Sequence, residues 1–181
     1  MSAEYHPGAD NIASLRDGIE LVGGLPEGVF GSAPEGLRIG GVGSQLRHCI
    51  DFYSCFLQGL ENGRVDYTRR ERDPRLETDR THAMDALERL IARLERITPR
   101  DADAGLQVRT DPTSEAGRPD WCPSTVAREL QFLLSHTIHH YALIVTLLKL
   151  QGVDLGAEFS TFGVAPSTLR HWKETGTYAG S

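Results

Sequence analysis

The sequence predicts an all-α protein built as a four-helix bundle, and three observations support this. Four stretches have helix-forming composition and end at glycine or proline signals: 9–22, 42–60, 74–97 and 123–150. No part of the chain alternates strand and helix signals, which argues against a doubly wound sheet. The connections between the four stretches are short or medium in length, which is typical of a bundle.

The first two predicted helices have clear ends. The stretch 9–22 ends at a Gly-Gly pair, and a loop rich in glycine and proline follows it. The stretch 42–60 ends before Gly63, where Asn-Gly is a typical C-cap signal. A charge-rich connector, 66–80, leads into the third helix.

The third predicted helix begins at Pro74, because proline suits the first turn of a helix, and continues to about Ile97. The polar segment that follows, 100–121, is irregular except for one short strand in the sequence LQVRT. The fourth helix begins at Pro123-Ser124, with Ser124 or Thr125 as its cap, and ends at Leu150.

Length and composition favour a single domain over residues 1–181, with the bundle at 9–151 and an irregular tail at 152–181 packed over one end of it. The net charge of −6 argues against a nucleic-acid partner. No apolar run approaches the roughly 18 residues of a membrane span, so no membrane contact is expected. The N-terminus shows no secretory signal, which predicts a cytoplasmic protein.

Three cysteines are predicted to be free thiols that serve as small buried residues: Cys49, Cys55 and Cys122. Their number is odd. Cys49 and Cys55 lie six positions apart in a helical segment, so they point to different sides of it. A disulfide or a CxxC site is therefore not expected.

The second helix carries a histidine that belongs to neither of its two faces. One face is a polar stripe that is predicted to face water: Arg47, Asp51, Ser54, Gln58 and Glu61. The opposite side is mainly apolar. His48 shares its line with Phe52 and Cys55, next to the core, so we expect it to be at least partly buried.

The fourth helix is apolar almost all round, yet it contains three histidines within five positions. His136 and His140 are four apart and therefore lie on one face, whereas His139 falls on a different line. Two imidazoles at this spacing can reach one metal ion, and a facing helix can supply a third. The alternative is a set of hydrogen-bonded core histidines, and spacing alone does not connect His48 to the pair.

The stretch RELQFLLSHTIHHY at 128–141 resembles the metal-binding helix of the DinB-like superfamily, and GSQLRHCIDFY at 43–53 resembles its partner helix. The resemblance covers about residues 9–151, and the FGVAPSTLR stretch of the tail is similar to a subgroup. It implies an up-down-down-up four-helix bundle and a homodimer. It also implies a divalent metal, zinc or nickel, held by His48, His136 and His140 with water completing the coordination; His139 has no ligand role in the pattern.

Three protein ligands and an open position are the pattern of a reactive metal site. Such a metal lowers the pKa of a bound water or thiol towards neutrality. Some members of the superfamily are S-transferases that use bacillithiol or mycothiol, and one branch isomerises maleylpyruvate. The expected function is therefore a metal-dependent thiol S-transferase or hydrolase acting on a small molecule or thiol. The alternative is a non-catalytic, metal-binding stress-response or interaction protein.

Other residues carry weaker predictions. Glu129 precedes His136 by seven positions, so it is either a catalytic base or partner of the site, or an acid favoured by the helix dipole. Asp51 is expected to be solvated. The arginines of the connector 66–80 either bind an anionic thiol or pair with the acids of the same loop. No role is assigned to His171.

Overall fold

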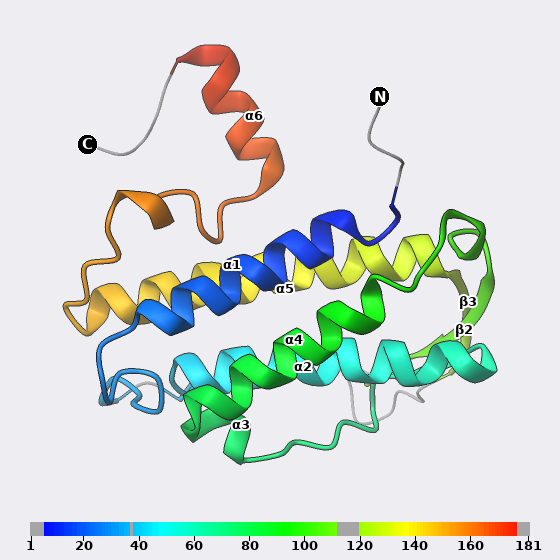
Figure 1. Cartoon of the computed structure of the whole chain (residues 1–181), viewed down its shortest axis with the longest axis horizontal. Helices are drawn as coiled ribbons and strands as arrows, with labels where there is room; N and C mark the ends of the chain where they lie inside the picture. Colours follow the sequence, from blue (N-terminus) through cyan, green and yellow to red (C-terminus); the bar gives the residue numbers. More distant parts are fainter. Residues whose placement is uncertain (1–5, 37, 112–119, 177–181) are drawn as a thin grey trace.

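The protein is mostly helical with a small sheet (Figure 1). This computed structural model describes residues 6–36, 38–111 and 120–176. The helices are α1 Ala9–Gly24, α2 Val42–Gly59, α3 Arg75–Thr78, α4 Arg80–Leu94, α5 Val126–Leu150 and α6 Pro166–Thr175. Short 3-10 turns span Leu60–Asn62, Pro99–Asp101 and Ala157–Phe159. The strands are β1 Arg64–Asp66, β2 Gly105–Arg109 and β3 Cys122–Thr125.

The four long helices enclose one core. Helices α1 and α2 each pack against both α4 and α5. Each long helix contributes a fully buried apolar side chain: Leu15, Phe56, Leu87 and Leu133 have no exposed surface. A polar connection also crosses this core, because the Asn11 amide donates both to the Tyr53 hydroxyl and to the carbonyl of Leu130, at 2.9 Å each. This polar connection therefore links α1, α2 and α5 inside the core.

The sheet has the order β1-β2-β3, with β1 and β2 parallel and β2 and β3 antiparallel. The predicted LQVRT strand is confirmed as β2, one residue earlier at each end. Strands β1 and β3 were not predicted from the sequence. Each has only three or four residues, and β3 contains a proline, which suits the edge of a sheet and not its centre.

The prediction of one continuous helix from Pro74 to Ile97 is wrong. The backbone at Asp79 is extended, with φ −103° and ψ 101°, and it separates α3 from α4. The Asp79 carboxylate accepts a hydrogen bond from the His82 backbone N–H at 2.9 Å, so it caps the first turn of α4. Aspartate favours this position because its side chain competes with the helical backbone for hydrogen bonds.

The last long helix also begins later than predicted. Pro123 and Ser124 belong to β3, and α5 starts at Val126. Of the two predicted caps, Thr125 takes the role, since its hydroxyl accepts from the Arg128 backbone N–H at 3.2 Å. Helices α1 and α2 begin where the sequence predicts them.

The prediction that the C-terminal tail is irregular is only partly correct, because the tail contains the helix α6. It lies along the side of α1 and α5 and not over the end of the long helices (Figure 1). None of the residues of α6 is buried. Among the described residues, no helix has both the length and the apolar composition needed to cross a membrane.

Candidate metal centre

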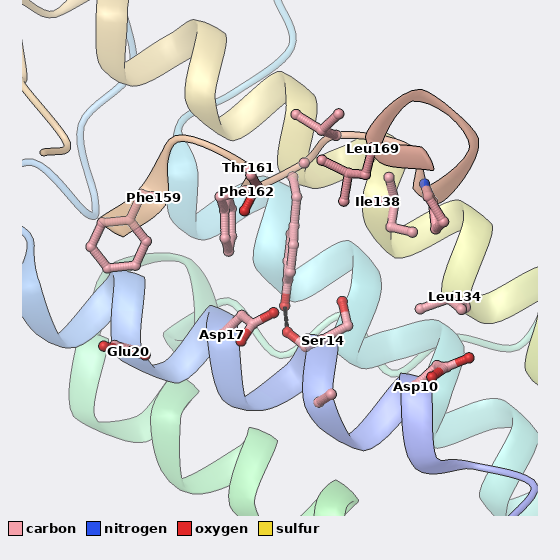
Figure 2. Close-up of a pocket in the computed structure, with 15 residues that line it drawn as sticks. Asp10, Ser14, Asp17, Glu20, Leu134, Ile138, Phe159, Thr161, Phe162 and Leu169 are labelled. Atoms are coloured by element: carbon pink, nitrogen blue, oxygen red, sulfur yellow. Dashed lines mark hydrogen bonds between the residues drawn. The ribbon is translucent and has the colours of Figure 1, made fainter. Parts of the chain in front are cut away.

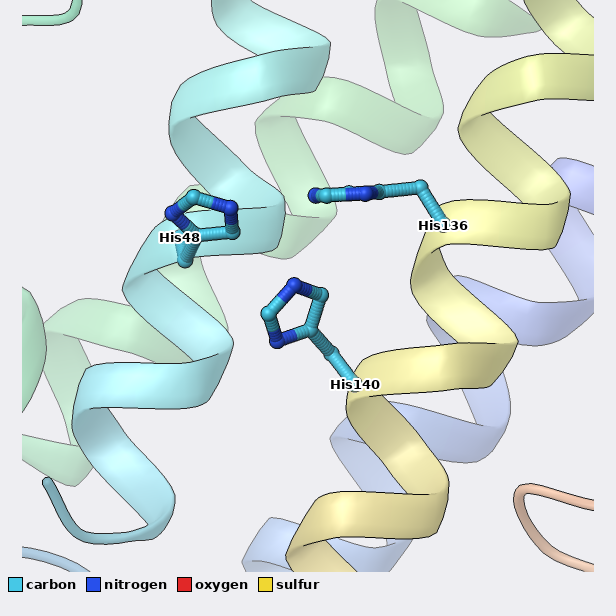
Figure 3. A group of neighbouring side chains, drawn as sticks. All are labelled: His48, His136 and His140. Carbon is cyan, nitrogen blue, oxygen red and sulfur yellow. The ribbon is translucent and has the colours of Figure 1, made fainter. Parts of the chain in front are cut away.

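Three histidines from two helices converge between α2 and α5 (Figure 3). One ring nitrogen from each of His48, His136 and His140 lies within 4.8 Å of the others. The ring centroids are 5.0 Å apart for His48–His136 and 4.6 Å apart for both His48–His140 and His136–His140. The structure therefore brings together the three residues that the sequence and the family resemblance single out.

Aromatic rings surround the histidines on one side. The Phe52 ring lies 4.9 Å from the His48 ring and 4.4 Å from the His136 ring, centroid to centroid. Phe132, one turn before His136 on α5, lies 5.6 Å from the same imidazole. All three histidines are half-buried, as expected for His48 from its position between the polar and apolar faces of α2.

His140 and His136 each have one ring nitrogen that makes no hydrogen bond to a described residue. The Gln45 side chain, only 6% exposed, places its carbonyl Oε1 2.7 Å from Nδ1 of His140. Gln45 uses its amide nitrogen to donate to the backbone carbonyl of Ile39, which orients the oxygen towards His140. His140 therefore donates through Nδ1, and its Nε2 carries the lone pair. Nε2 of His136 is buried and has no hydrogen-bond partner among the described residues.

The surroundings of the three histidines favour their neutral form. Burial, with smaller contributions from His140 and from nearby arginines including Arg70, lowers the pKa of His48 to about 4. Burial and the neighbouring histidines lower the pKa of His136 and of His140 to about 4 as well. Neutral imidazole is the form that binds a metal ion, so all three side chains are ready to act as ligands at pH 7.

The donor set fits a divalent metal ion. Three neutral imidazoles on two helices are a common ligand set for zinc, nickel, copper and iron. A buried nitrogen without a partner, as on His136, is costly in a folded protein and is satisfied when a metal takes that place. Three protein ligands leave at least one coordination position open for water or another ligand.

Glu129 lies in the first turn of α5, where one of the two predictions placed it as an acid favoured by the helix dipole, and its side chain is buried. It is 3% exposed, and both of its carboxylate oxygens accept hydrogen bonds. The Tyr67 hydroxyl donates to Oε2 at 2.9 Å, and the Ser124 hydroxyl donates to Oε1 at 2.6 Å. Within the described residues, Glu129 makes no hydrogen bond to any of the three histidines, so its observed contacts join the connector, β3 and α5.

The prediction that Asp51 is solvated is wrong. Asp51 is 4% exposed, and Nη1 of Arg47 lies 2.7 Å from its carboxylate. The backbone N–H of Arg72 also donates to Asp51. The connector covers the N-terminal half of the polar stripe of α2, while Gln58 and Glu61 remain exposed. A helical periodicity identifies a polar face but not the loop that covers it.

The connector also brings an arginine next to the candidate centre, which sequence reasoning did not single out. The Arg70 side chain is 12% exposed, and its guanidinium lies 5.3 Å from the centroid of the Phe52 ring. It donates to the backbone carbonyl of Tyr67 at 2.9 Å and pairs with Asp111 at 3.0 Å. Arg70 therefore pairs with an acid outside the connector and also packs beside the aromatic wall of the site. Arg69 and Arg75 do pair with acids of the same loop, Asp66 and Asp73, as one prediction held.

The three cysteines are free, as predicted. Cys49 and Cys55 are buried, but Cys122 is exposed, so its predicted role as a buried residue is wrong. Burial raises the pKa of the Cys49 thiol to about 12 and that of Cys55 to about 11. Both thiols are therefore protonated at neutral pH.

The fold and the site define a helical protein with a candidate three-histidine metal centre. The sequence profile of the DinB superfamily matches residues 16–144, and the chain belongs to this superfamily. The chain is also similar to FK506-binding protein 5 from the fungus Rhizopus delemar, at 30% identity over 111 residues. That match covers 61% of this chain and 28% of the fungal protein, so the chain spans less than a third of that relative's length.

Proposed function

We propose that the protein binds one divalent metal ion, zinc or nickel, through His48, His136 and His140 and uses it to activate water or a thiol. The reaction class is thiol S-transfer or hydrolysis of a small molecule. The proposed fold that carries this site is the up-down-down-up four-helix bundle of the superfamily. The observation that carries the proposal is the convergence of three neutral imidazoles, one of which has a buried nitrogen without a partner.

A bound metal ion would act as a Lewis acid and lower the pKa of a coordinated water or thiol. The residues of the chain set the conditions for this chemistry. Gln45 holds the imidazole of His140 in the Nδ1–H form. Phe52 and Phe132 restrict water beside His136, and the positive charge of Arg70 favours an anionic reactant near them.

The thiol in an S-transfer reaction would come from a second substrate and not from the chain. Cys49 is fully buried and Cys55 is nearly so, and both have pKa values far above neutrality. The thiolate, not the thiol, is the nucleophile, so neither side chain is suited to attack at pH 7. This favours a small-molecule thiol or a water molecule as the nucleophile.

Metal content and its dependence on single histidines test the proposal. Protein purified without a metal-affinity tag is expected to hold about one equivalent of metal per chain after reloading. His48→Ala is expected to reduce the affinity at least about tenfold, as expected for loss of one of three ligands. His139→Ala is the matched control, because His139 is exposed on the same helix as two of the ligands and should leave the affinity unchanged. Equal affinities for the two variants would refute the assignment of His48.

A second candidate is a non-catalytic metal-binding protein for a stress response or an interaction. The observation in its favour is that the ligands come from two helices, so a bound metal would cross-link α2 to α5 and stabilise the fold. A large fall in melting temperature on chelation, with no turnover of any thiol or hydrolysable substrate in a broad panel, would favour this candidate over the enzyme.

A further inference from the structure

A cavity of about 380 Å³ lies between α1, α5 and the C-terminal tail (Figure 2). On α5 it is lined by Leu134, Ile138 and Tyr141. At 100° per residue, these positions point away from the side of α5 that carries His136 and His140. The cavity is therefore distinct from the candidate metal centre, and the proposed function makes no use of it.

The two sides of the cavity differ in chemistry. Helix α1 contributes three carboxylates, from Asp10, Asp17 and Glu20. The tail supplies an aromatic and aliphatic wall that includes Phe159, Phe162 and Leu169, which Figure 2 shows opposite the acids. Among the described residues that line the cavity there is no lysine, arginine or histidine. An acidic wall thus faces an apolar one with no basic side chain of the lining between them.

The acids of α1 that line the cavity lack ion-pair partners among the described residues. None of the three acids forms an ion pair with any residue that the structure describes. Partial desolvation by the surrounding residues and the neighbouring negative charge of Glu20 raise the pKa of Asp17. Ser14 is only 9% exposed and lines the same cavity, yet its hydroxyl makes no hydrogen bond within the described part of the chain. A cation with N–H donors would relieve the repulsion and satisfy the hydroxyl.

The apolar wall is tightly docked against the helices. The Phe162 ring stacks on the Tyr141 ring at 4.3 Å between centroids, with 14° between their planes. The Tyr141 hydroxyl donates to the backbone carbonyl of Ser14 at 3.0 Å, which ties α5 to α1 beneath the cavity. Gly163 has φ +72°, and any side chain there would collide with the backbone of Ala142. The tail therefore holds a fixed position against α5 that presents its aromatic rings to the cavity.

We propose that this cavity binds a small organic cation, an amine or ammonium group joined to an aromatic or aliphatic body. The ammonium group would lie beside Asp17 and Glu20, where attraction to two carboxylates is strongest and the Ser14 hydroxyl is near. The body would pack against Phe159, Phe162 and Leu169, which provide apolar contact and, at the ring faces, cation–π attraction. The volume is at the lower end of the range for small-molecule sites.

A titration with two probes of the same shape tests the proposal on the full chain. The probes are 2-phenylethylammonium, which is charged, and 2-phenylethanol, which is neutral. We expect the cation to bind at least about tenfold more tightly in a calorimetric or NMR titration, because only it is attracted to the carboxylates. Equal affinity for the two probes, or no saturation by the cation below about 10 mM, would overturn the proposal.

Two charge-neutralising variants locate the site. Asp17→Asn is expected to weaken binding of the cation by about tenfold. Asp85→Asn removes the same charge from an exposed position on α4, outside the cavity, and should leave binding unchanged. Both substitutions are at exposed positions, so both variants should fold, which a melting curve checks. An equal effect of the two variants would show that binding reflects only the net negative charge, and would refute the assignment.

A chelator separates this proposal from the proposed metal function. The affinity for 2-phenylethylammonium is expected to be the same in metal-loaded and metal-free protein, because the cavity shares no residue with the histidine cluster. Loss of binding on chelation would overturn the claim of a separate site. Absence of metal binding by the protein would leave the affinity for the cation intact.

Discussion

The Gln45 side chain accepts a hydrogen bond from His140, with 2.7 Å between Oε1 and Nδ1. The two residues are far apart in the sequence, on α2 and α5, and the contact determines which nitrogen of His140 can face a metal ion. The backbone carbonyl of Ile39 holds the other end of the Gln45 amide. This chain of contacts links the start of α2 to the candidate metal centre.

Replacing Gln45 should weaken metal binding without removing a ligand. In Gln45→Leu, the His140 imidazole loses the partner that fixes its tautomer and orientation, so the metal affinity should fall by about 10- to 100-fold. A competition titration with a chelator of known affinity measures this. Gln58→Leu, an exposed position on the same helix, is the control and should bind metal as the unmodified protein does. Equal affinities in the two variants would show that Gln45 does not position His140.

The metal-free protein should lose stability as the pH falls from about 6.5 towards 4. The pKa of each site histidine is about 4 in the folded chain, against 6.5 for an exposed histidine. The unfolded chain therefore binds more protons in this interval, and acidification favours it. The contribution of the three imidazoles is fully present above pH 6.5. The imidazoles are half-buried and titrate together, so the loss should be well below the sum of three independent groups, roughly 2–5 kcal/mol by pH 4.

Urea unfolding in the presence of a chelator, at pH 7 and pH 5, measures this loss. His136→Gln removes one of the titrating groups and should reduce the difference in unfolding free energy between the two pH values. His171→Gln changes an exposed histidine of α6 and should not. If His136→Gln and the unmodified protein showed the same difference, burial of His136 would not be the source of the pH dependence.

The sequence predicted the histidine cluster better than it predicted the surroundings of that cluster. The spacing of His136 and His140 follows from the geometry of a single helix, so local periodicity is sufficient to place them together. His48 was connected to them through the family resemblance, because no local pattern states which helices face each other. Local periodicity does not predict which side chains around the histidine cluster are buried by other segments of the chain.

Asp51 and Glu129 illustrate why those neighbours were not predicted. Both were judged from the helix that carries them, yet segments distant in the sequence bury them. Arg72 of the connector contacts Asp51, and Tyr67 of the connector contacts Glu129. The break at Asp79 has a local cause, since aspartate favours an N-cap, and the sequence contained that signal. Strands β1 and β3 have no such local signal, because they are very short and form only by pairing with β2, which is distant in the sequence.

Gly43 marks a close approach of α2 to α3, and an alanine there should destabilise the protein. A Cβ atom at this position would collide with the backbone carbonyl of Glu77. Because the obstacle is backbone and not a flexible side chain, Gly43→Ala should lower the free energy of unfolding by about 2–3 kcal/mol. Gly24→Ala, at the end of α1 with nothing within 4 Å, should be neutral or stabilising. Denaturant unfolding of both variants measures the contrast, and a neutral Gly43→Ala would show that α3 can move away.

Asp66 should support the small sheet at neutral pH and lose this role in acid. It lies directly opposite Arg109 in the register of β1 and β2, and Nε of Arg109 is 3.2 Å from its carboxylate. The Thr68 hydroxyl donates to the same carboxylate at 2.7 Å. The ion pair with Arg109, helped by Thr68, lowers the pKa of Asp66 to about 2. The stabilisation is therefore present above about pH 4, the pKa of an unfolded aspartate, and disappears as the pH falls towards 2.

Asp66→Asn should accordingly lower the free energy of unfolding at pH 7 by about 1–2 kcal/mol, since the pair is only partly shielded from water. The deficit should shrink as the pH is lowered from 4 to 2, where the unmodified protein loses the same interaction. Asp103→Asn, an exposed position close to β2, should show no deficit at either pH. Urea unfolding across this range gives the comparison. A deficit for Asp66→Asn that stayed constant down to pH 2 would mean that the substitution acts through packing or hydrogen bonding and not through the charge on Asp66.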